Sequence, residues 1–194
     1  MKRIIAATAI AAFAFGASAQ DGDATAEEAA YIAQLEQELG GQLMNSPLTL
    51  DYETYGTAEF KTKQVRAADA PGGAGYQVRV TSAGRNPWDV TTQVELDGAV
   101  AKGDMLRVAF WANAAKAPKS GEPYVTARIQ QKDDPYTGVL EQGFALQKGW
   151  KLYEMAAPAQ AGFGDGEINL VLNVGDRKQS VEFGQLFVVN HSAK

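Results

Sequence analysis

The stretch that decides the fold is Met105-Leu106-Arg107-Val108-Ala109-Phe110-Trp111-Ala112-Asn113-Ala114. Successive side chains of a β-strand point to opposite faces of a sheet. One face of this run carries Leu106, Val108, Phe110 and Ala112. The opposite face carries Arg107, Ala109, Trp111 and Asn113. The alternation predicts a strand with one face in a core and one face outside it.

Similar short runs continue on both sides of this stretch. We expect strands at Leu48–Thr54, Glu59–Arg66, Tyr76–Thr81, Val90–Leu96, Asp104–Ala114, Tyr124–Gln131, Leu152–Ala156, Glu167–Val174 and Ser180–Val189. Gly-, Pro- and Asp-containing turn signals separate them, as at Pro71-Gly72-Gly73 and Asp97-Gly98. No helical pattern alternates with these runs, so the sequence predicts an all-β, antiparallel sandwich or jelly roll.

Residues 20–45 differ from the rest of the chain. Ala24–Leu39 is rich in Ala, Glu and Gln, with Tyr31, Ile32, Leu35 and Leu39 at helical spacing and Gly40-Gly41 as a stop. We therefore expect one short amphipathic helix before a β domain at residues 46–194. Such a helix suits a lid, spacer or dimer contact better than a catalytic element.

Residues 1–19 read as a signal peptide. Met1-Lys2-Arg3 is followed by an apolar run from Ile4 to Phe15 and by the small residues Ala17-Ser18-Ala19, so we expect cleavage before Gln20. The alternative is an N-terminal membrane anchor, although the run is short for a membrane span. With no cysteine in the chain, lipid attachment at cysteine and disulfides are excluded. The expected location is the periplasm or the outside of the cell.

Charge limits the partners of the exported chain. Removing Lys2 and Arg3 from the 18 basic residues leaves 16 against 23 acidic ones, a net charge near −7. An acidic domain has no electrostatic reason to bind nucleic acid or an anionic membrane surface.

The outward positions of the predicted strands carry an unusual set of side chains. They combine an indole, several amides and a guanidinium: Trp111, Asn113, Gln93, Arg128, Gln130 and Asn173. An aromatic ring can stack on the apolar face of a sugar, and amides and Arg can bond its hydroxyls. Two loops, around Trp88 and Tyr136, offer similar groups. The alternatives are that Trp111 is covered by the N-terminal helix or a loop, and that Asn86-Pro87 and Asp134-Pro135 simply start turns.

Several segments together resemble a known family. In order they are Gly75–Val80, Trp88–Gln93, Lys102–Ala114, Gln130-Gln131, Gly149–Tyr153 and Val181–Leu186. This set resembles the jelly-roll carbohydrate-binding modules of families four, nine and twenty-two, which are often attached to xylanases and glucanases. The likeness covers about residues 48–190.

The resemblance implies a jelly roll of the galactose-binding type that binds a polysaccharide or oligosaccharide without catalysis. Trp88 and Gln93 occupy the ends of the family's Trp-led strand. Trp111 matches an aromatic position that can be scaffold or ligand platform, and Trp150 matches a turn position that favours a structural role. The outward strand positions, the two loops and this resemblance together predict the carbohydrate-binding residues Trp88, Gln93, Trp111, Asn113, Arg128, Gln130, Tyr136 and Asn173.

The sequence departs from the family at both ends of the domain. Gly184-Gln185 stands where an Asp pair is usual, and Pro47–Glu53 replaces the usual opening segment. Those regions often hold a structural calcium in such folds. Oxygen donors are present at Asp51, Glu53, Asp176 and Glu182, but their spacing specifies no site. No cofactor is expected, and the sequence does not decide whether a structural calcium ion is bound.

Catalytic patterns are sparse. His191, the only histidine, lies near the C-terminus, and the chain has no Gly-x-Ser-x-Gly motif. The many carboxylates would permit a glycoside hydrolase or lyase, but no sequence pattern around them singles out a catalytic pair. Three functions remain: a carbohydrate-binding protein, a structural or protein-binding envelope module that kept the fold, and a small enzyme. The first is favoured.

Overall fold

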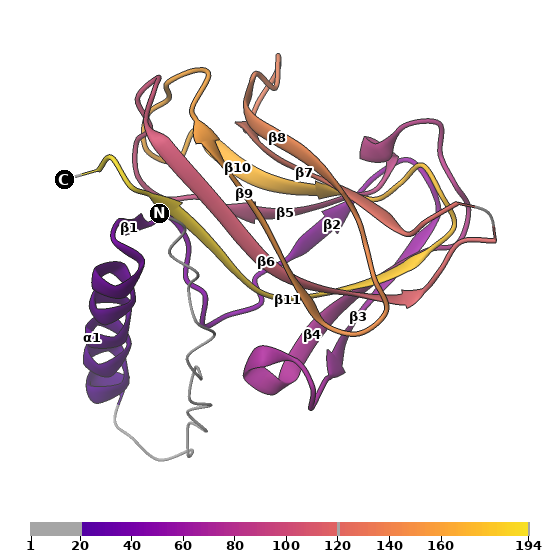
Figure 1. The fold of residues 1–194 in the computed structure, drawn as a ribbon, viewed down its shortest axis with the longest axis horizontal. Helices are drawn as coiled ribbons and strands as arrows, with labels where there is room; N and C mark the ends of the chain where they lie inside the picture. Colours follow the sequence, from indigo (N-terminus) through magenta and orange to yellow (C-terminus); the bar gives the residue numbers. More distant parts are fainter. Residues whose placement is uncertain (1–20, 120, 194) are drawn as a thin grey trace, which may run out of the picture.

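The computed structural model describes residues 21–119 and 121–193, which form a two-layer β-sandwich with one N-terminal helix (Figure 1). The predicted signal peptide lies outside these residues. The helix and its following strands are α1 (Asp21–Leu39), β1 (Gln42–Leu43), β2 (Glu53–Tyr55), β3 (Phe60–Arg66), β4 (Ala74–Val80) and β5 (Thr91–Glu95). They are followed by β6 (Met105–Lys116), β7 (Tyr124–Gln131), β8 (Gly138–Ala145), β9 (Lys151–Pro158), β10 (Ile168–Asn173) and β11 (Ser180–Asn190). Two 3-10 turns, η1 (Pro71–Gly73) and η2 (Pro87–Asp89), flank β4 and β5.

The strands form two antiparallel sheets. The six-stranded sheet has the order β3-β4-β11-β6-β9, and β1 pairs with β11. The five-stranded sheet has the order β2-β5-β10-β7-β8. The predicted all-β jelly roll with one preceding helix is therefore confirmed. Each sheet has one inner face toward the other sheet and one outer face.

The core lies between the two inner faces, as the alternation in β6 predicts. Leu106, Val108, Phe110 and Ala112 have no exposed surface. Phe110 is stacked on Tyr153 at 5.7 Å between ring centroids and meets Phe144 edge-on at 5.5 Å. These aromatic contacts join β6 to β9 and β8 and fix how the sheets face each other.

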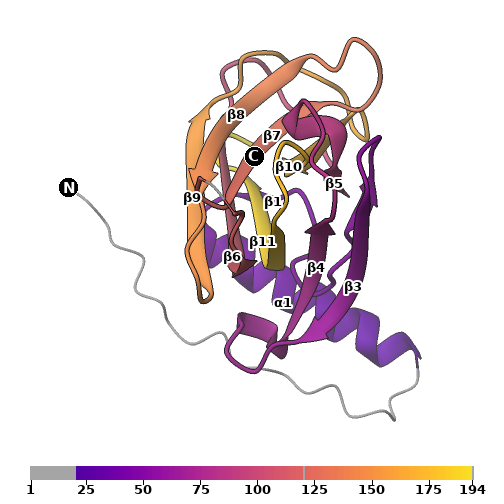
Figure 2. The same ribbon diagram turned by 90° about the vertical axis from the view of Figure 1, so that its right-hand side faces the viewer.

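Helix α1 packs against the end of β11 through the apolar side chains that the sequence places at helical spacing. Tyr31, Ile32, Leu35 and Leu39 form one cluster with Leu43, Phe187 and Val189. From this contact the helix extends away from the sandwich (Figures 1 and 2). Among the described residues, no helix combines the length and the apolar character that crossing a membrane requires.

Two strand predictions were wrong. The structure has β8 at Gly138–Ala145, where no strand was expected, and the predicted strand Leu48–Thr54 is replaced by the short β2, Glu53–Tyr55. In β8 the register shifts opposite Ile129 and Gln130, and Val139 and Leu140 are both buried. A register shift of this kind removes the two-residue alternation by which strands are recognised. Residues 44–52, between β1 and β2, form a loop instead.

Candidate functional site

The eight predicted binding residues lie on two different faces of the sandwich. Gln93, Arg128, Gln130 and Asn173 belong to β5, β7 and β10, with their side chains on the outer face of the five-stranded sheet. Trp88 lies in η2, and Tyr136 lies in the turn between β7 and β8. Trp111 and Asn113 belong to β6, on the outer face of the six-stranded sheet. The eight residues therefore do not share one surface, because alternation separates inside from outside but does not say which sheet a strand joins.

Asn113 has a local structural role on the six-stranded sheet. Its Nδ2 donates to Glu182 at 2.8 Å, and its Oδ1 accepts a hydrogen bond from the Gly149 amide at 2.9 Å. These bonds hold the turn that carries Trp150.

Trp150 packs closely over this sheet. A Cβ added at Gly75 would lie 2.8 Å from the ring of Trp150, and one added at Gly184 would lie 3.1 Å from it. Trp111 is half-buried beside Gly184 and is not part of the helix cluster. The structural role expected for Trp150 fits these contacts.

The outer face of the five-stranded sheet is built from rows of side chains that run across the strands. Glu53 pairs with Gln93, Gln93 with Val171, and Val171 with Arg128. The next outward row contains Glu95, Asn169 and Gln130, and the row on the other side contains Tyr55, Thr91, Asn173 and Thr126. We call these side chains, together with Glu141 opposite Arg128, the five-stranded face. Val171 at its centre is only 1% exposed although it points outward.

A chain of hydrogen bonds crosses the five-stranded face. Gln93 Nε2 donates to Glu53 at 2.8 Å, and Asn169 Nδ2 donates to Gln93 Oε1 at 2.9 Å. Next to it, Thr91 Oγ1 donates to Asn173 Oδ1 at 2.8 Å. The predicted residues Gln93 and Asn173 are thus held in place by neighbours on the same face.

Two buried polar atoms of this face have no hydrogen-bond partner among the described residues: Arg128 Nε and Asn169 Oδ1. Leaving a buried donor or acceptor unpaired costs about 1–3 kcal/mol each. An unpaired donor and an unpaired acceptor on neighbouring strands are what a hydroxyl-bearing ligand can satisfy.

Arg128 connects the sheet to the turn above it. Its Nη2 donates to the Tyr136 carbonyl at 2.6 Å, and its Nη1 lies 3.4 Å from Glu141. A second ion pair, Lys132–Glu95 at 2.6 Å, holds the start of the same turn. The β7–β8 turn is therefore fixed to both the middle and the side of the five-stranded face.

Two exposed tyrosines belong to this region, one on β2 and one in the β7–β8 turn. Tyr55 on β2 is 44% exposed and Tyr136 is 48% exposed. Partial burial raises the pKa of the Tyr55 hydroxyl, and the nearby Tyr136 and Glu53 raise it further. Both rings are exposed and therefore available to a ligand that lies on this face.

Trp88 is the most exposed large apolar side chain among the described residues, at 60%. Its carbonyl accepts a hydrogen bond from Thr91 on the five-stranded face. Its turn is held by Asp89, whose carboxylate accepts from the amides of Arg85 at 2.7 Å and Asn86 at 3.0 Å. These backbone hydrogen bonds, with a smaller one from Thr57, lower the pKa of Asp89.

Because the pKa of Asp89 is lowered in the folded protein, the stability of the turn that carries Trp88 is expected to depend on pH. The charged carboxylate stabilises the folded turn above pH 3.8, the ordinary pKa, and this stabilisation is lost as the pH falls through the lower folded value. We expect Asp89→Asn to release the turn already at neutral pH, seen as a shift and narrowing of the Trp88 indole NMR signal. Asp97→Asn, which removes another surface carboxylate, is the control. An unchanged Trp88 signal in Asp89→Asn would contradict this role.

The sequence was compared with families of known proteins. The model of the family described as a carbohydrate binding domain, CBM_4_9, matches residues 46–156, which is more than half of the chain. The chain belongs to this carbohydrate-binding domain family. A search of curated proteins found no match.

Solved structures of carbohydrate-binding domains share the fold. A CBM4 structure has a TM-score of 0.56 at 16% identity, covering 72% of this chain and 86% of that one. The second N-terminal cellulose-binding domain of Cellulomonas fimi β-1,4-glucanase C has a TM-score of 0.53 at 20% identity, covering 78% and 92%. The CBM22-1 xylan-binding domain of Paenibacillus barcinonensis Xyn10C has a TM-score of 0.53 at 13% identity, covering 80% and 98%. The resemblance noted from the sequence is confirmed.

Tyr55, Asn169 and Glu141 are among the residues of this carbohydrate-binding domain's five-stranded face that sequence reasoning did not select. Tyr55 falls just after the predicted first strand, but continuing its alternation from Glu53 would have found it. Asn169 lies on the same face as Asn173, four residues away on β10, but its free acceptor depends on neighbours in other strands. Glu141 lies in β8, the strand that was not expected.

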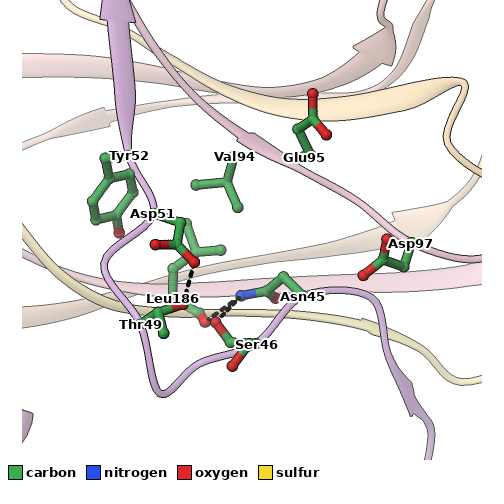
Figure 3. A pocket seen from close by; sticks show the side chains of 9 residues that line it. All are labelled: Asn45, Ser46, Thr49, Asp51, Tyr52, Val94, Glu95, Asp97 and Leu186. Atoms are coloured by element: carbon green, nitrogen blue, oxygen red, sulfur yellow. Dashed lines mark hydrogen bonds between the residues drawn. The ribbon is translucent and has the colours of Figure 1, made fainter.

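The domain also has a cavity of about 350 Å³ between the loop before β2 and residues of β5 and β11, and Glu95 is the one residue of the five-stranded face that lines it (Figure 3). Asn45, Asp51, Tyr52 and Asp97 are among its lining residues. Burial raises the pKa of Tyr52, whose hydroxyl donates to the Gly184 carbonyl at 2.7 Å. Tyr52 therefore lines the cavity as a neutral phenol.

The four oxygen donors considered for calcium do not meet in this domain. Asp51 lines the cavity, Glu53 bonds to Gln93, Glu182 bonds to Gln77 and Asn113, and Asp176 pairs with Arg177 at 2.6 Å. Within residues 21–119 and 121–193, no group of three or more His, Cys, Asp or Glu side chains could hold a metal ion.

Proposed function

We propose that this chain is an exported, non-catalytic protein that binds a neutral polysaccharide or oligosaccharide on the five-stranded face. The observation that carries the proposal is the pair of unpartnered polar atoms, Arg128 Nε and Asn169 Oδ1, in a region that also carries the exposed rings of Tyr55 and Tyr136. Rings that stack on a sugar and amides that bond its hydroxyls give the two kinds of contact that a glycan needs.

Charge favours a neutral glycan. The five-stranded face carries Glu53, Glu95 and Glu141 against Arg128, and the adjoining turn adds Lys132, Asp133 and Asp134. This excess of carboxylates repels uronic acids and sulfated sugars. The cellulose-binding and xylan-binding names of the similar structures make β-glucans and xylans the first polymers to test.

The carboxylates of the face support binding rather than catalysis. Glu53 accepts a hydrogen bond from Gln93, Glu95 pairs with Lys132, and Glu141 pairs with Arg128. Each is occupied in organising the surface. Export follows from the signal peptide predicted at residues 1–19, and it brings the protein to where such polymers occur.

Affinity electrophoresis of the chain lacking residues 1–19, in gels with xylan, mixed-linkage β-glucan or a uronate polymer, tests the proposal. We expect retardation by at least one neutral polymer and none by the uronate polymer. The same polymers incubated with the protein should release no reducing sugar. Normal migration in every gel would contradict binding, and a captured envelope protein would then favour the protein-binding alternative.

A further inference from the structure

The hydrogen-bond chain on the five-stranded face has a direction that one residue sets. We propose that Glu53 is a positioning residue: through Gln93 it turns the Asn169 amide so that Oδ1 accepts a hydrogen bond from a hydroxyl of the bound sugar. This inference rests on the proposed function. It adds that the glycan site fixes the orientation of the sugar hydroxyl that donates to Asn169.

The direction follows from the hydrogen-bonding capacity of a carboxylate. An ionised carboxylate only accepts, so Gln93 must turn its Nε2 toward Glu53, at 2.8 Å. Its Oε1 then faces Asn169 and can only accept, so Asn169 presents Nδ2 to it, at 2.9 Å. The oxygen of Asn169 is left over as an acceptor.

Asn169 Oδ1 accepts no hydrogen bond from the residues that the structure describes. Asn169 is 1% exposed. Buried polar groups are almost always paired. A ligand hydroxyl that inserts between the outer side chains can donate to this oxygen.

A matching donor lies on the next strand. Arg128 on β7 is paired with Val171, two residues along β10 from Asn169, and Arg128 Nε is the other unpartnered atom of the face. A hydroxyl both donates and accepts. Two neighbouring sugar hydroxyls can therefore serve both atoms, one donating to Asn169 and the other accepting from Arg128. The ligand class is a neutral sugar with vicinal hydroxyls.

Glu53→Gln tests the positioning role. The substituted amide keeps the shape but can donate as well as accept, so Gln93 and Asn169 are free to turn around. We expect a three- to tenfold loss of affinity, the worth of one neutral hydrogen bond. Glu154→Gln, which neutralises a carboxylate on the opposite sheet, should bind like the wild type. Thermal unfolding of each variant should show that the fold is retained.

A double-mutant cycle with Asn169→Ala separates positioning from other roles. Calorimetry uses xylohexaose and cellohexaose with the wild type, the two single variants and the double variant. If Glu53 acts through Asn169, Glu53→Gln costs affinity in the wild type and nothing further in Asn169→Ala.

Each other outcome overturns a defined part of the account. Equal losses from Glu53→Gln in both backgrounds would show that Glu53 acts without Asn169. Wild-type affinity in Glu53→Gln with a loss in Asn169→Ala would overturn the positioning role and leave the proposed function standing. Failure of the wild type to bind any neutral polymer or oligosaccharide would instead remove the proposed function.

Discussion

Phe110→Ala is expected to lower the free energy of unfolding by about 3–5 kcal/mol. Phe110 has no exposed surface, and its ring contacts Tyr153, Phe144 and Phe183, which come from three other strands. Removing the ring leaves a cavity between the sheets that these neighbours cannot fill together. Chemical denaturation followed by fluorescence measures the change.

Leu152→Ala is the matched control for Phe110→Ala. Leu152 lies on β9, paired with Trp111 next to Phe110, but it is 44% exposed. We expect a loss below about 1 kcal/mol, because little apolar surface leaves the core. Equal losses in the two variants would contradict the assignment of inner and outer faces.

Arg128→Ala is expected to weaken the binding of a neutral oligosaccharide by about 10- to 100-fold. Hydrogen bonds to charged groups are worth about 1.5–3 kcal/mol, and each 1.4 kcal/mol is a factor of ten. The substitution removes the unpaired Nε donor and also frees the turn that carries Tyr136. Isothermal titration calorimetry with xylohexaose and cellohexaose measures the loss.

Arg107→Ala is the control for Arg128→Ala. Arg107 lies on the outer face of the six-stranded sheet and pairs with Glu154 of the adjacent strand, as Arg128 pairs with Glu141. The two arginine side chains are similarly exposed, at 25% and 28%. We expect Arg107→Ala to bind like the wild type. A larger loss of affinity in Arg107→Ala than in Arg128→Ala would indicate that the glycan binds to the six-stranded sheet instead.

The sequence predicted the fold better than it predicted the site. The inner and outer residues of β6, β7 and β10 follow from alternation, which is a local property. The pairing of strands is not local: β6 lies beside β11 and β9, so Trp111 and Asn113 face away from Gln93 and Arg128. No pattern within a single strand contains that information.

The central residues of the face depend on contacts that the chain order does not show. Asn169 is distinctive only because Gln93, from β5, uses its amide nitrogen and leaves its oxygen without a partner. Tyr55 comes from β2 and Tyr136 from the β7–β8 turn, which are far apart in sequence. The strand pattern could place each residue outside the core, but only the assembled sheet brings them together.

The most direct test of the central claim is an NMR titration of the ¹⁵N-labelled protein with a neutral hexasaccharide that the calorimetry shows to bind. The side-chain amide signals of Gln93, Gln130 and Asn169 report on the five-stranded face, and those of Gln77 and Asn113 report on the opposite sheet. We predict saturable shifts in the first three signals and none in the other two. Shifts confined to Gln77 and Asn113 would contradict the assignment of the glycan site.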